Sequence, residues 1–255
     1  MLYFVALLSN HNTMKIALIG YGKMGHAIET IALQKGYEIV LRIGIENLED
    51  FTIENIATAD VAIEFTAPHS AADNIKKCVD AGVAVVSGST GWLQDYKSIT
   101  QYCLEKKGSF LYASNFSIGV NLFFELNRFL AQLMQSHEEY SVSIEEIHHT
   151  QKKDAPSGTA ITLAEQIMEH INTKQHWINH ISDNKKELQI ISERIDPAPG
   201  THKIKYSSAI DDIEIIHTAH NRQGFAAGAV LAAAFICGKK GIFSMKDVLN
   251  LGDEI

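Results

Sequence analysis

The chain carries a glycine-rich turn close to its start, with the sequence Gly20-Tyr21-Gly22-Lys23-Met24-Gly25. A short apolar run at residues 15–19 precedes the turn, and apolar side chains recur at helical spacing over residues 23–35 after it. In this strand, turn and helix setting the first glycine permits the tight turn, the second lets the backbone approach a pyrophosphate, and the third lets helix and strand pack closely. We therefore expect these six residues to bind a dinucleotide, whose phosphates face the helix N-terminus.

The first half of the chain alternates between short apolar runs and helical patterns. This alternation is typical of an α/β domain of Rossmann type, in which helices cover both faces of a parallel sheet. Ligands of such sheets bind beyond the carboxyl ends of the strands. The predicted strands are residues 15–19, 37–43, 60–65, 83–87 and 109–112, and the predicted helices are residues 23–35, 68–81 and 93–106.

The second half has a different rhythm, which predicts a central α+β domain with an open mixed sheet. A polar stretch at residues 172–187 is expected to be a surface loop. A helix rich in Ala and Gly is expected at residues 223–237, where small side chains allow close packing. The other predicted helices are residues 120–134 and 157–170, and the predicted strands are residues 140–148, 188–193, 203–208 and 213–217.

Composition excludes several classes of protein. The net charge of -8 argues against a nucleic-acid-binding protein, which needs a basic face. The three cysteines are an odd number without metal-ligand spacing, so reduced thiols in the cytoplasm are expected. The apolar run at residues 2–8 is too short to cross a membrane and lacks a preceding basic residue, so residues 1–13 are interpreted as an N-terminal extension.

One part of the dinucleotide pattern is missing. A carboxylate that binds the ribose normally follows the second strand. Here that strand ends Leu41-Arg42-Ile43-Gly44, and the nearest carboxylates are Glu38 and Glu46. Arg42 could instead bind the 2′-phosphate of NADP, or it could be a solvated surface cation. The sequence therefore leaves both NADPH and NADH open as the cofactor.

The densest group of reactive side chains lies in residues 148–159. His148 and His149 close a predicted strand, and Lys152 lies in the loop that follows. Ser157 then suits the cap of a helix, whose first N–H groups, at Gly158 and Thr159, would face outward. Two imidazoles, an ammonium group and a helix N-terminus form a cationic pocket, which predicts a small substrate that bears carboxylates. His and Lys can also transfer protons when their pKa values are tuned.

From residue 15 to about residue 251, the chain resembles the 4-hydroxy-tetrahydrodipicolinate reductases, long called dihydrodipicolinate reductases. Residues 148–159, with the pattern HHxxKxDxPSGT, carry most of this resemblance, and the glycine turn alone is not specific. The other matching segments are Glu64-Phe65-Thr66-Ala67-Pro68, Gly88-Ser89-Thr90-Gly91 and the run from Ala113 to Asn121.

The resemblance implies a reduction of a cyclic dicarboxylate with NADH or NADPH, in the diaminopimelate route to lysine. It implies a dinucleotide-binding domain at residues 14–117 and 221–255, and a domain at residues 118–220 that binds substrate and forms a homotetramer. Hinges are expected near Phe116 and Asn221. By motif position, His148 and Lys152 transfer protons, and His149, Gly158 and Thr159 bind substrate. The cofactor positions are Gly20 to Gly25, then Gly88, Ser89 and Thr90, then Ala113, Ser114, Asn115 and Phe116.

Two other functions are weighed against this one. A different dinucleotide-dependent dehydrogenase would explain the glycine turn but not the His and Lys pocket. A nucleotide-sensing regulator without catalysis would need a partner surface or a DNA-binding element, and the sequence offers neither. Turnover with the condensation product of pyruvate and aspartate semialdehyde separates these alternatives.

Overall fold

The computed structural model describes residues 13–221 and 223–252. They form two compact units, described separately below: unit 1 is residues 13–116 with 226–251, and unit 2 is residues 117–225. The observed division after Phe116 falls one residue before the predicted boundary, and the return after Phe225 falls five residues beyond it. The expected extension at residues 1–13 lies outside the described residues, except for Thr13.

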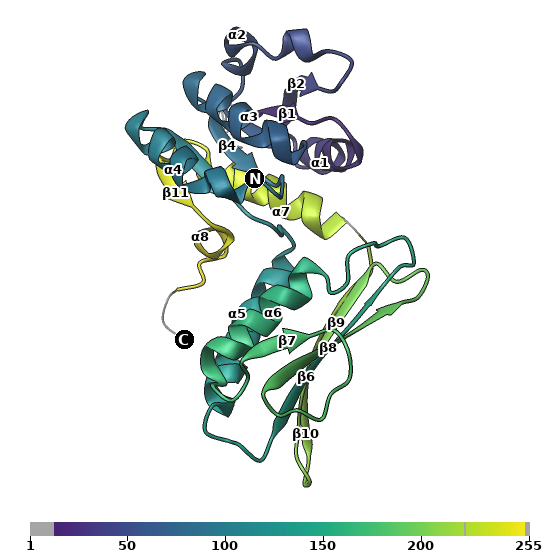
Figure 1. The fold of residues 1–255 in the computed structure, drawn as a ribbon. Helices are drawn as coiled ribbons and strands as arrows, with labels where there is room; N and C mark the ends of the chain where they lie inside the picture. The colour runs from purple at the N-terminus through teal and green to yellow at the C-terminus, as the bar shows by residue number, and fades with distance from the viewer. Residues whose placement is uncertain (1–12, 222, 253–255) are drawn as a thin grey trace, which may run out of the picture. The chain divides into compact units, whose positions relative to one another are not determined.

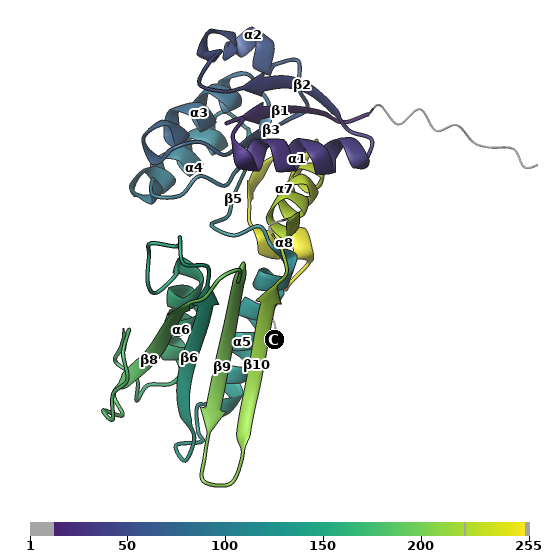
Figure 2. The same cartoon turned by 90° about the vertical axis from the view of Figure 1, so that its right-hand side faces the viewer.

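Unit 1 contains a parallel sheet of six strands in the order β11-β5-β4-β3-β1-β2. Figure 1 labels β11, β4, β1 and β2 of this sheet, and Figure 2 labels β3 and β5. This is the predicted Rossmann-type sheet with one further strand. The strands are β1 (Lys15–Ile19), β2 (Glu38–Ile43), β3 (Val61–Glu64), β4 (Ala84–Ser87), β5 (Ser109–Tyr112) and β11 (Gly241–Phe243). The helices are α1 (Lys23–Gln34), α2 (Ile53–Ile56), α3 (Pro68–Asp80), α4 (Tyr96–Glu105), α7 (Gln223–Ile236) and α8 (Met245–Leu249), with short 3-10 turns at Leu48–Asp50 and Leu93–Asp95.

Both faces of this sheet are covered, which explains why its central strands are almost wholly apolar. On one face, Ile16 and Leu18 of β1 pack with residues of α1 and α7. On the other face, Ala17 and Ile19 of the same strand pack with residues of α3 and α4. Burial of this kind stabilises a fold by about 25 cal/mol for each Å² of apolar surface removed from water.

Unit 2 contains the predicted open mixed sheet, and one layer of helices covers a face of it. Its strands lie in the order β10-β9-β6-β8-β7; β6, β8 and β7 pair parallel, whereas β9 pairs antiparallel with both of its neighbours, β6 and β10. Helices α5 and α6 pack on one face (Figure 2) through Phe123, Leu163 and Ile167. The bounds are α5 (Ile118–Met134), β6 (Ser141–His148), α6 (Gly158–His170), β7 (His176–Ile178), β8 (Glu187–Arg194), β9 (Gly200–Ser207) and β10 (Asp212–Ala219).

Four short elements were not predicted, and one expectation was wrong. β7 lies within residues 172–187, so that stretch is not a simple loop. β11 and α8 near the C-terminus and α2 after the second strand are only three to five residues long, too short to show a periodicity. In the part of the chain that the structure describes, no helix combines the length and apolar character needed to cross a membrane.

The small-residue helix α7 packs as closely as its composition predicts. A Cβ atom placed on Gly228 would lie 1.7 Å from the backbone oxygen of Phe116. Because that neighbour is backbone, it cannot rotate away, and either the helix or the segment around Phe116 must move to admit a side chain.

We therefore expect Gly228→Ala to lower the free energy of unfolding by about 1–3 kcal/mol, the usual cost of overpacking a core. Gly224→Ala in the same helix is the matched control, because its nearest neighbour lies at 3.5 Å, an ordinary contact distance. Urea unfolding of both variants measures the difference. Equal stability of the two variants would show that α7 is not tightly held.

Candidate active site

The glycine turn lies at the carboxyl ends of β1 and β2. The N–H groups of Gly20 and Tyr21 both donate to the Ile43 carbonyl at 2.9 Å, which ties the turn to the end of β2. Beside the turn is a cavity of about 640 Å³, lined by residues 19–22, 43–46, 65–67 and others including Leu48, Phe51, His69, Ser70 and Asn74. Its position beyond the strand ends is where parallel sheets bind nucleotides.

The three glycines of the turn differ in what surrounds them. A Cβ on Gly20 would meet the Phe65 carbonyl oxygen at 2.0 Å, and one on Gly25 would meet the Gly20 carbonyl oxygen at 2.6 Å. Nothing lies within 4 Å of a Cβ on Gly22. Packing thus explains Gly20 and Gly25, whereas the open space at Gly22 fits a ligand that approaches the backbone at the start of α1. Lys23 and Met24 form the first turn of that helix.

Arg42 is held by the first helix rather than facing the cavity. Its Nε donates to Glu29 at 2.7 Å, its Nη2 forms an ion pair with the same carboxylate, and Tyr21 donates its hydroxyl to Glu29 as well. Hydrogen bonding by Tyr21 and Arg42 outweighs burial and holds the pKa of Glu29 below its usual range. Arg42 is not among the residues that line the cavity, whereas the exposed Glu46 is. Arg42 thus shares the Glu29 carboxylate with Tyr21 of the glycine turn but does not line the cavity.

A buried carboxylate, Glu64, organises the next two strand ends. It terminates β3 with no exposed surface and accepts hydrogen bonds from the hydroxyls of Ser87 at 2.6 Å and Ser89 at 2.8 Å. The Thr66 N–H also donates to it at 3.1 Å, and the Thr66 hydroxyl forms a further contact. Of the predicted cofactor residues here, Ser89 is buried in this network, and only Thr90 is exposed. Gly88 is packed against the Phe65 ring, which a Cβ would meet at 2.2 Å.

The predicted cofactor residues after β5 also include both exposed and buried residues. The Ala113 N–H donates to the Ser87 carbonyl at 3.2 Å, and Ser114 is exposed beside it. Asn115 is half-buried, whereas Phe116 is 2% exposed and its ring lies against Phe65 with centroids 5.6 Å apart. Phe116 therefore contributes to the core of unit 1.

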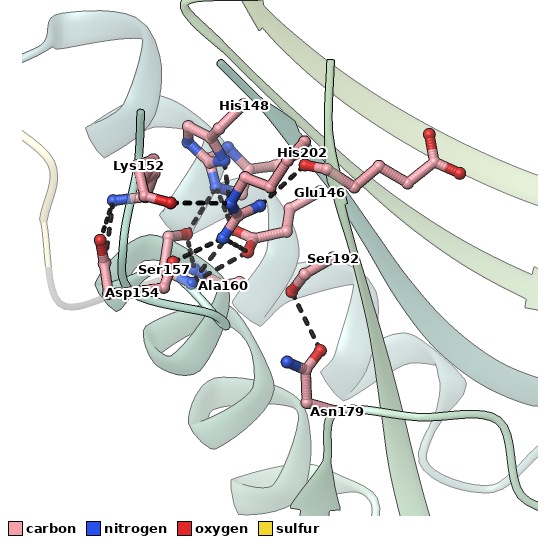
Figure 3. A network of polar contacts seen from close by, with 11 residues as sticks. Glu146, His148, Lys152, Asp154, Ser157, Ala160, Asn179, Ser192 and His202 are labelled. Atoms are coloured by element: carbon pink, nitrogen blue, oxygen red, sulfur yellow. Dashed lines mark hydrogen bonds and ion pairs between the residues drawn. The ribbon is translucent and has the colours of Figure 1, made fainter. Parts of the chain in front are cut away.

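In unit 2, His148 lies at the end of β6 against a second buried carboxylate (Figure 3). Its Nδ1 atom is 3.4 Å from Oε2 of Glu146, close enough for an ion pair but outside hydrogen-bond geometry. The His202 ring lies edge-on to the His148 ring at 5.1 Å, and its Nε2 is 3.6 Å from the same carboxylate oxygen. Burial lowers the pKa of His148 to about 4, although the Glu146 carboxylate opposes this shift.

Glu146 has no exposed surface and is satisfied by donors from three elements. The Ser157 N–H donates to it at 3.0 Å, and Nη2 of Arg194 forms an ion pair with it at 3.2 Å. Burial opposes its ionisation, but hydrogen bonds from His202 and Ser157 outweigh burial and hold the pKa of Glu146 well below its usual range. A buried carboxylate needs such partners, since an unpaired one would cost several kcal/mol.

The loop that carries Lys152 is fastened by Arg194. The Arg194 guanidinium donates to the carbonyls of Lys152 at 3.3 Å and Asp154 at 2.5 Å. The Lys152 ammonium pairs with both oxygens of Asp154, at 2.9 and 2.8 Å, and lowers the pKa of that carboxyl. Lys152 is therefore ion-paired in this structure, in a loop that Arg194 holds at the end of β6.

The start of α6 has the predicted cap. The Ser157 hydroxyl accepts from the Ala160 N–H at 3.2 Å, and the helix begins at Gly158. A Cβ on Gly158 would have nothing within 4 Å, and Thr159 is half-buried beside it. His149 follows His148 as a half-buried residue close to Asp196. An anion can approach such a helix start.

Sequence reasoning missed Glu146, Arg194 and His202. A signal was present, because Val142, Ile144, Glu146 and His148 share one face of β6 by two-residue periodicity. A carboxylate on an otherwise apolar face indicates a buried partner network. Its partners could not be found from the sequence, since Arg194 and His202 come from strands 48 and 56 residues further along.

Comparison with known proteins agrees with this geometry. A model of the dihydrodipicolinate reductase N-terminus matches residues 14–116, and a model of the dihydrodipicolinate reductase C-terminus matches residues 119–249. The 4-hydroxy-tetrahydrodipicolinate reductase of Christiangramia forsetii is 52% identical over 93% of this chain and 98% of its own length. The protein of the same name from Methanosarcina barkeri is 37% identical over 81% of this chain and 78% of its own.

The chain belongs to the dihydrodipicolinate reductase family.

The family assignment confirms the resemblance carried by residues 148–159. Solved structures agree on the fold. A dihydrodipicolinate reductase from Paenisporosarcina sp. TG-14, solved with dipicolinate, has a TM-score of 0.76 and 23% identity over 94% of this chain and 100% of its own. A probable dehydrogenase from Thermotoga maritima has a TM-score of 0.54 and 10% identity, over 92% of each chain. The family's C-terminal model also covers α7, which the structure places mostly in unit 1.

Proposed function

We propose that this protein is a 4-hydroxy-tetrahydrodipicolinate reductase of the diaminopimelate route to lysine, acting in the cytoplasm. The observation that carries the proposal is the 52% identity to a protein of that name over nearly both full lengths. The reaction consumes NADH or NADPH and one proton, forms tetrahydrodipicolinate, and releases the 4-hydroxyl group as water. The buried free thiols of Cys78 and Cys103 fit a reducing compartment.

The residues of unit 2 can serve this chemistry at two places. The N–H groups at the start of α6, at Gly158 and Thr159, and the imidazole of His149 can bind the substrate carboxylates. His148 and Lys152 can supply protons, because both stand at the end of β6 where that helix begins. If the Lys152 ammonium leaves Asp154 and pairs with a substrate anion, Arg194 still holds the loop through the backbone carbonyls of Lys152 and Asp154.

The cofactor fits unit 1. The open backbone at Gly22, the N-terminus of α1 and the cavity beyond β1 and β2 suit a dinucleotide. A reduced nicotinamide supplies the hydride when it is bound. The exposed segments at Thr90 and Ser114, which lie at the ends of the neighbouring strands, remain proposed cofactor contacts.

We expect His148→Gln and Lys152→Ala each to lower turnover by about 10²-fold while cofactor affinity stays nearly unchanged, because each removes a proton-transfer group and neither lies in unit 1. Steady-state assays with freshly condensed pyruvate and aspartate semialdehyde, followed by loss of nicotinamide absorbance, measure the effect. Lys153→Ala is the matched control, since Lys153 is the exposed neighbour. Inactive, well-folded wild-type protein with both cofactors would overturn the function, and normal rates in both variants would overturn the residue assignment.

The surroundings of the turn support NADH as the preferred cofactor. Glu46 lines the cavity two residues beyond the usual place of the ribose-binding acid, and its carboxylate can accept from ribose hydroxyls. The same charge would repel a 2′-phosphate. Arg42, the cation at the end of β2, is already neutralised by Glu29.

We therefore expect the wild-type protein to bind NADH about tenfold more tightly than NADPH, a difference of about 1.4 kcal/mol. Glu46→Gln should bring the two dissociation constants closer, because it weakens NADH binding and removes the repulsion of the NADPH 2′-phosphate. Glu29→Gln should bring them closer by releasing Arg42. Fluorescence titration of both cofactors gives the dissociation constants, and Glu49→Gln, an exposed neighbour, is the control. A preference for NADPH in the wild-type protein would contradict the interpretation.

We also propose that the protein is a homotetramer. One face of α5 is exposed in the single chain although its side chains are large and apolar, and β10 adds exposed isoleucines at an edge of the sheet. These residues are Ile118, Leu122, Leu126, Phe129 and Leu133 of α5, with Ile213 and Ile216 of β10. Apolar surface of this extent is usually covered by a partner. Light scattering of the purified protein tests the proposal, and a monomer at micromolar concentration would contradict it.

A further inference from the structure

The His148 ring has one nitrogen whose role the reaction does not explain. Its Nδ1 atom is buried, and within the described chain it has no hydrogen-bond partner. It faces Oε2 of Glu146 at 3.4 Å. A neutral imidazole carries its proton on one nitrogen, and the neighbour of each nitrogen decides which. A hydrogen-bond acceptor beside Nδ1 favours the tautomer that carries the proton on Nδ1. Nε2 is then the nitrogen that can exchange a proton with another group.

The Glu146 carboxylate is fixed before any ligand binds. Its Oε1 atom receives the Ser157 N–H at 3.0 Å and the Arg194 guanidinium at 3.2 Å. On the other side, Nε2 of His202 is 3.6 Å from Oε2 and 3.1 Å from the Ser157 hydroxyl. Donors from β8, β9 and the start of α6 thus hold the carboxylate beneath the His148 ring (Figure 3).

We propose that Glu146 is a positioning residue for the reduction: its carboxylate holds the Nδ1–H of His148, so that Nε2 is the atom that exchanges a proton with the substrate. This inference rests on the proposed function. Glu146 touches neither substrate nor cofactor in this scheme and acts through His148 alone. The step is a proton transfer without a change of oxidation state. The Nδ1 proton stays in the hydrogen bond to Glu146, while the Nε2 proton passes to the substrate and is replaced by a proton from water.

The charges around His148 give Glu146 a second effect. His202 from β9, Arg194 from β8 and Lys152 from the loop all disfavour a protonated ring, as burial does. Glu146, on the same strand as His148, is the opposing charge that favours it. An opposite charge at this distance typically shifts a pKa by one unit or more.

An alternative use of the same atoms is a metal site. Glu146, His148 and His202 offer three ligand atoms within 4.8 Å of one another. The guanidinium of Arg194 contacts the same carboxylate, and a cation placed there would meet its positive charge. The surroundings therefore favour protons over a metal ion.

The test is Glu146→Gln, which keeps the shape of the side chain and removes its charge. We expect kcat to fall by about 10-fold to 10²-fold, with NADH affinity unchanged, and the inflection of the kcat–pH profile that reports His148 to move about one pH unit lower, because His148 loses the charge that stabilises its protonated form. Glu145→Gln is the matched control, since Glu145 is the next residue of β6 and points to the opposite face. A uniform loss of kcat at every pH, with an unmoved midpoint, would reveal a purely structural role and overturn the proposal.

A second measurement does not depend on the folding of the Glu146→Gln variant. Long-range ¹⁵N–¹H correlation spectra of the wild-type protein at pH 7 report the tautomer of each histidine, and His148→Gln identifies the His148 signals. We expect the Nδ1–H form, and an Nε2–H form would overturn the proposal. Activity that is lost on chelation and restored by Zn²⁺ would also overturn it, in favour of the metal site. An active wild-type enzyme with an unaffected Glu146→Gln variant would reject this inference alone and leave the proposed reduction standing.

Discussion

The buried carboxylate of Glu146 is the interaction on which the arrangement of unit 2 depends. An ionised carboxylate without water around it must be surrounded by donors, and here these come from β8, β9 and the start of α6. Of these donors, Arg194 also holds the loop of Lys152, and the carboxylate itself lies 3.4 Å from Nδ1 of His148. Removing the charge would take from Arg194 its carboxylate partner and leave it the backbone carbonyls of the Lys152 loop.

Unit 1 uses the same device with different partners. Glu64 ends a strand with no exposed surface and gathers hydroxyl and N–H donors from residues 66, 87 and 89. Both carboxylates lie near strand ends, where loops leave the sheet and backbone groups lack regular partners. A carboxylate at the strand ends can accept hydrogen bonds from several of these loops at once. The loops at the strand ends are thereby ordered without a ligand.

Much of the fold could be predicted from the sequence because its elements are periodic. The strands of unit 1 are buried on both faces and appear in the sequence as apolar runs, and helix α6 follows the serine that caps it. The strand β11 could not be predicted, because three residues carry no period and its pairing with β5 joins segments far apart in the chain. In the site, His148 and Lys152 were found from one short motif. Arg194 and His202 were not, because their function depends on a pairing of strands that no local pattern encodes. The ion pair between Arg42 and Glu29 was not predicted either, because it depends on how α1 packs beside β2.

The uneven packing around the glycines has a consequence for how this protein can change. Gly20, Gly25, Gly88 and Gly228 are enclosed by their own chain, so selection for folding alone preserves them. Gly22 and Gly158 border empty space, and a methyl group there would disturb no neighbour within the chain. A variant at either of these two positions should keep its thermal stability while losing ligand affinity. Substitutions at such positions can change which ligand the protein binds without lowering the stability of its fold.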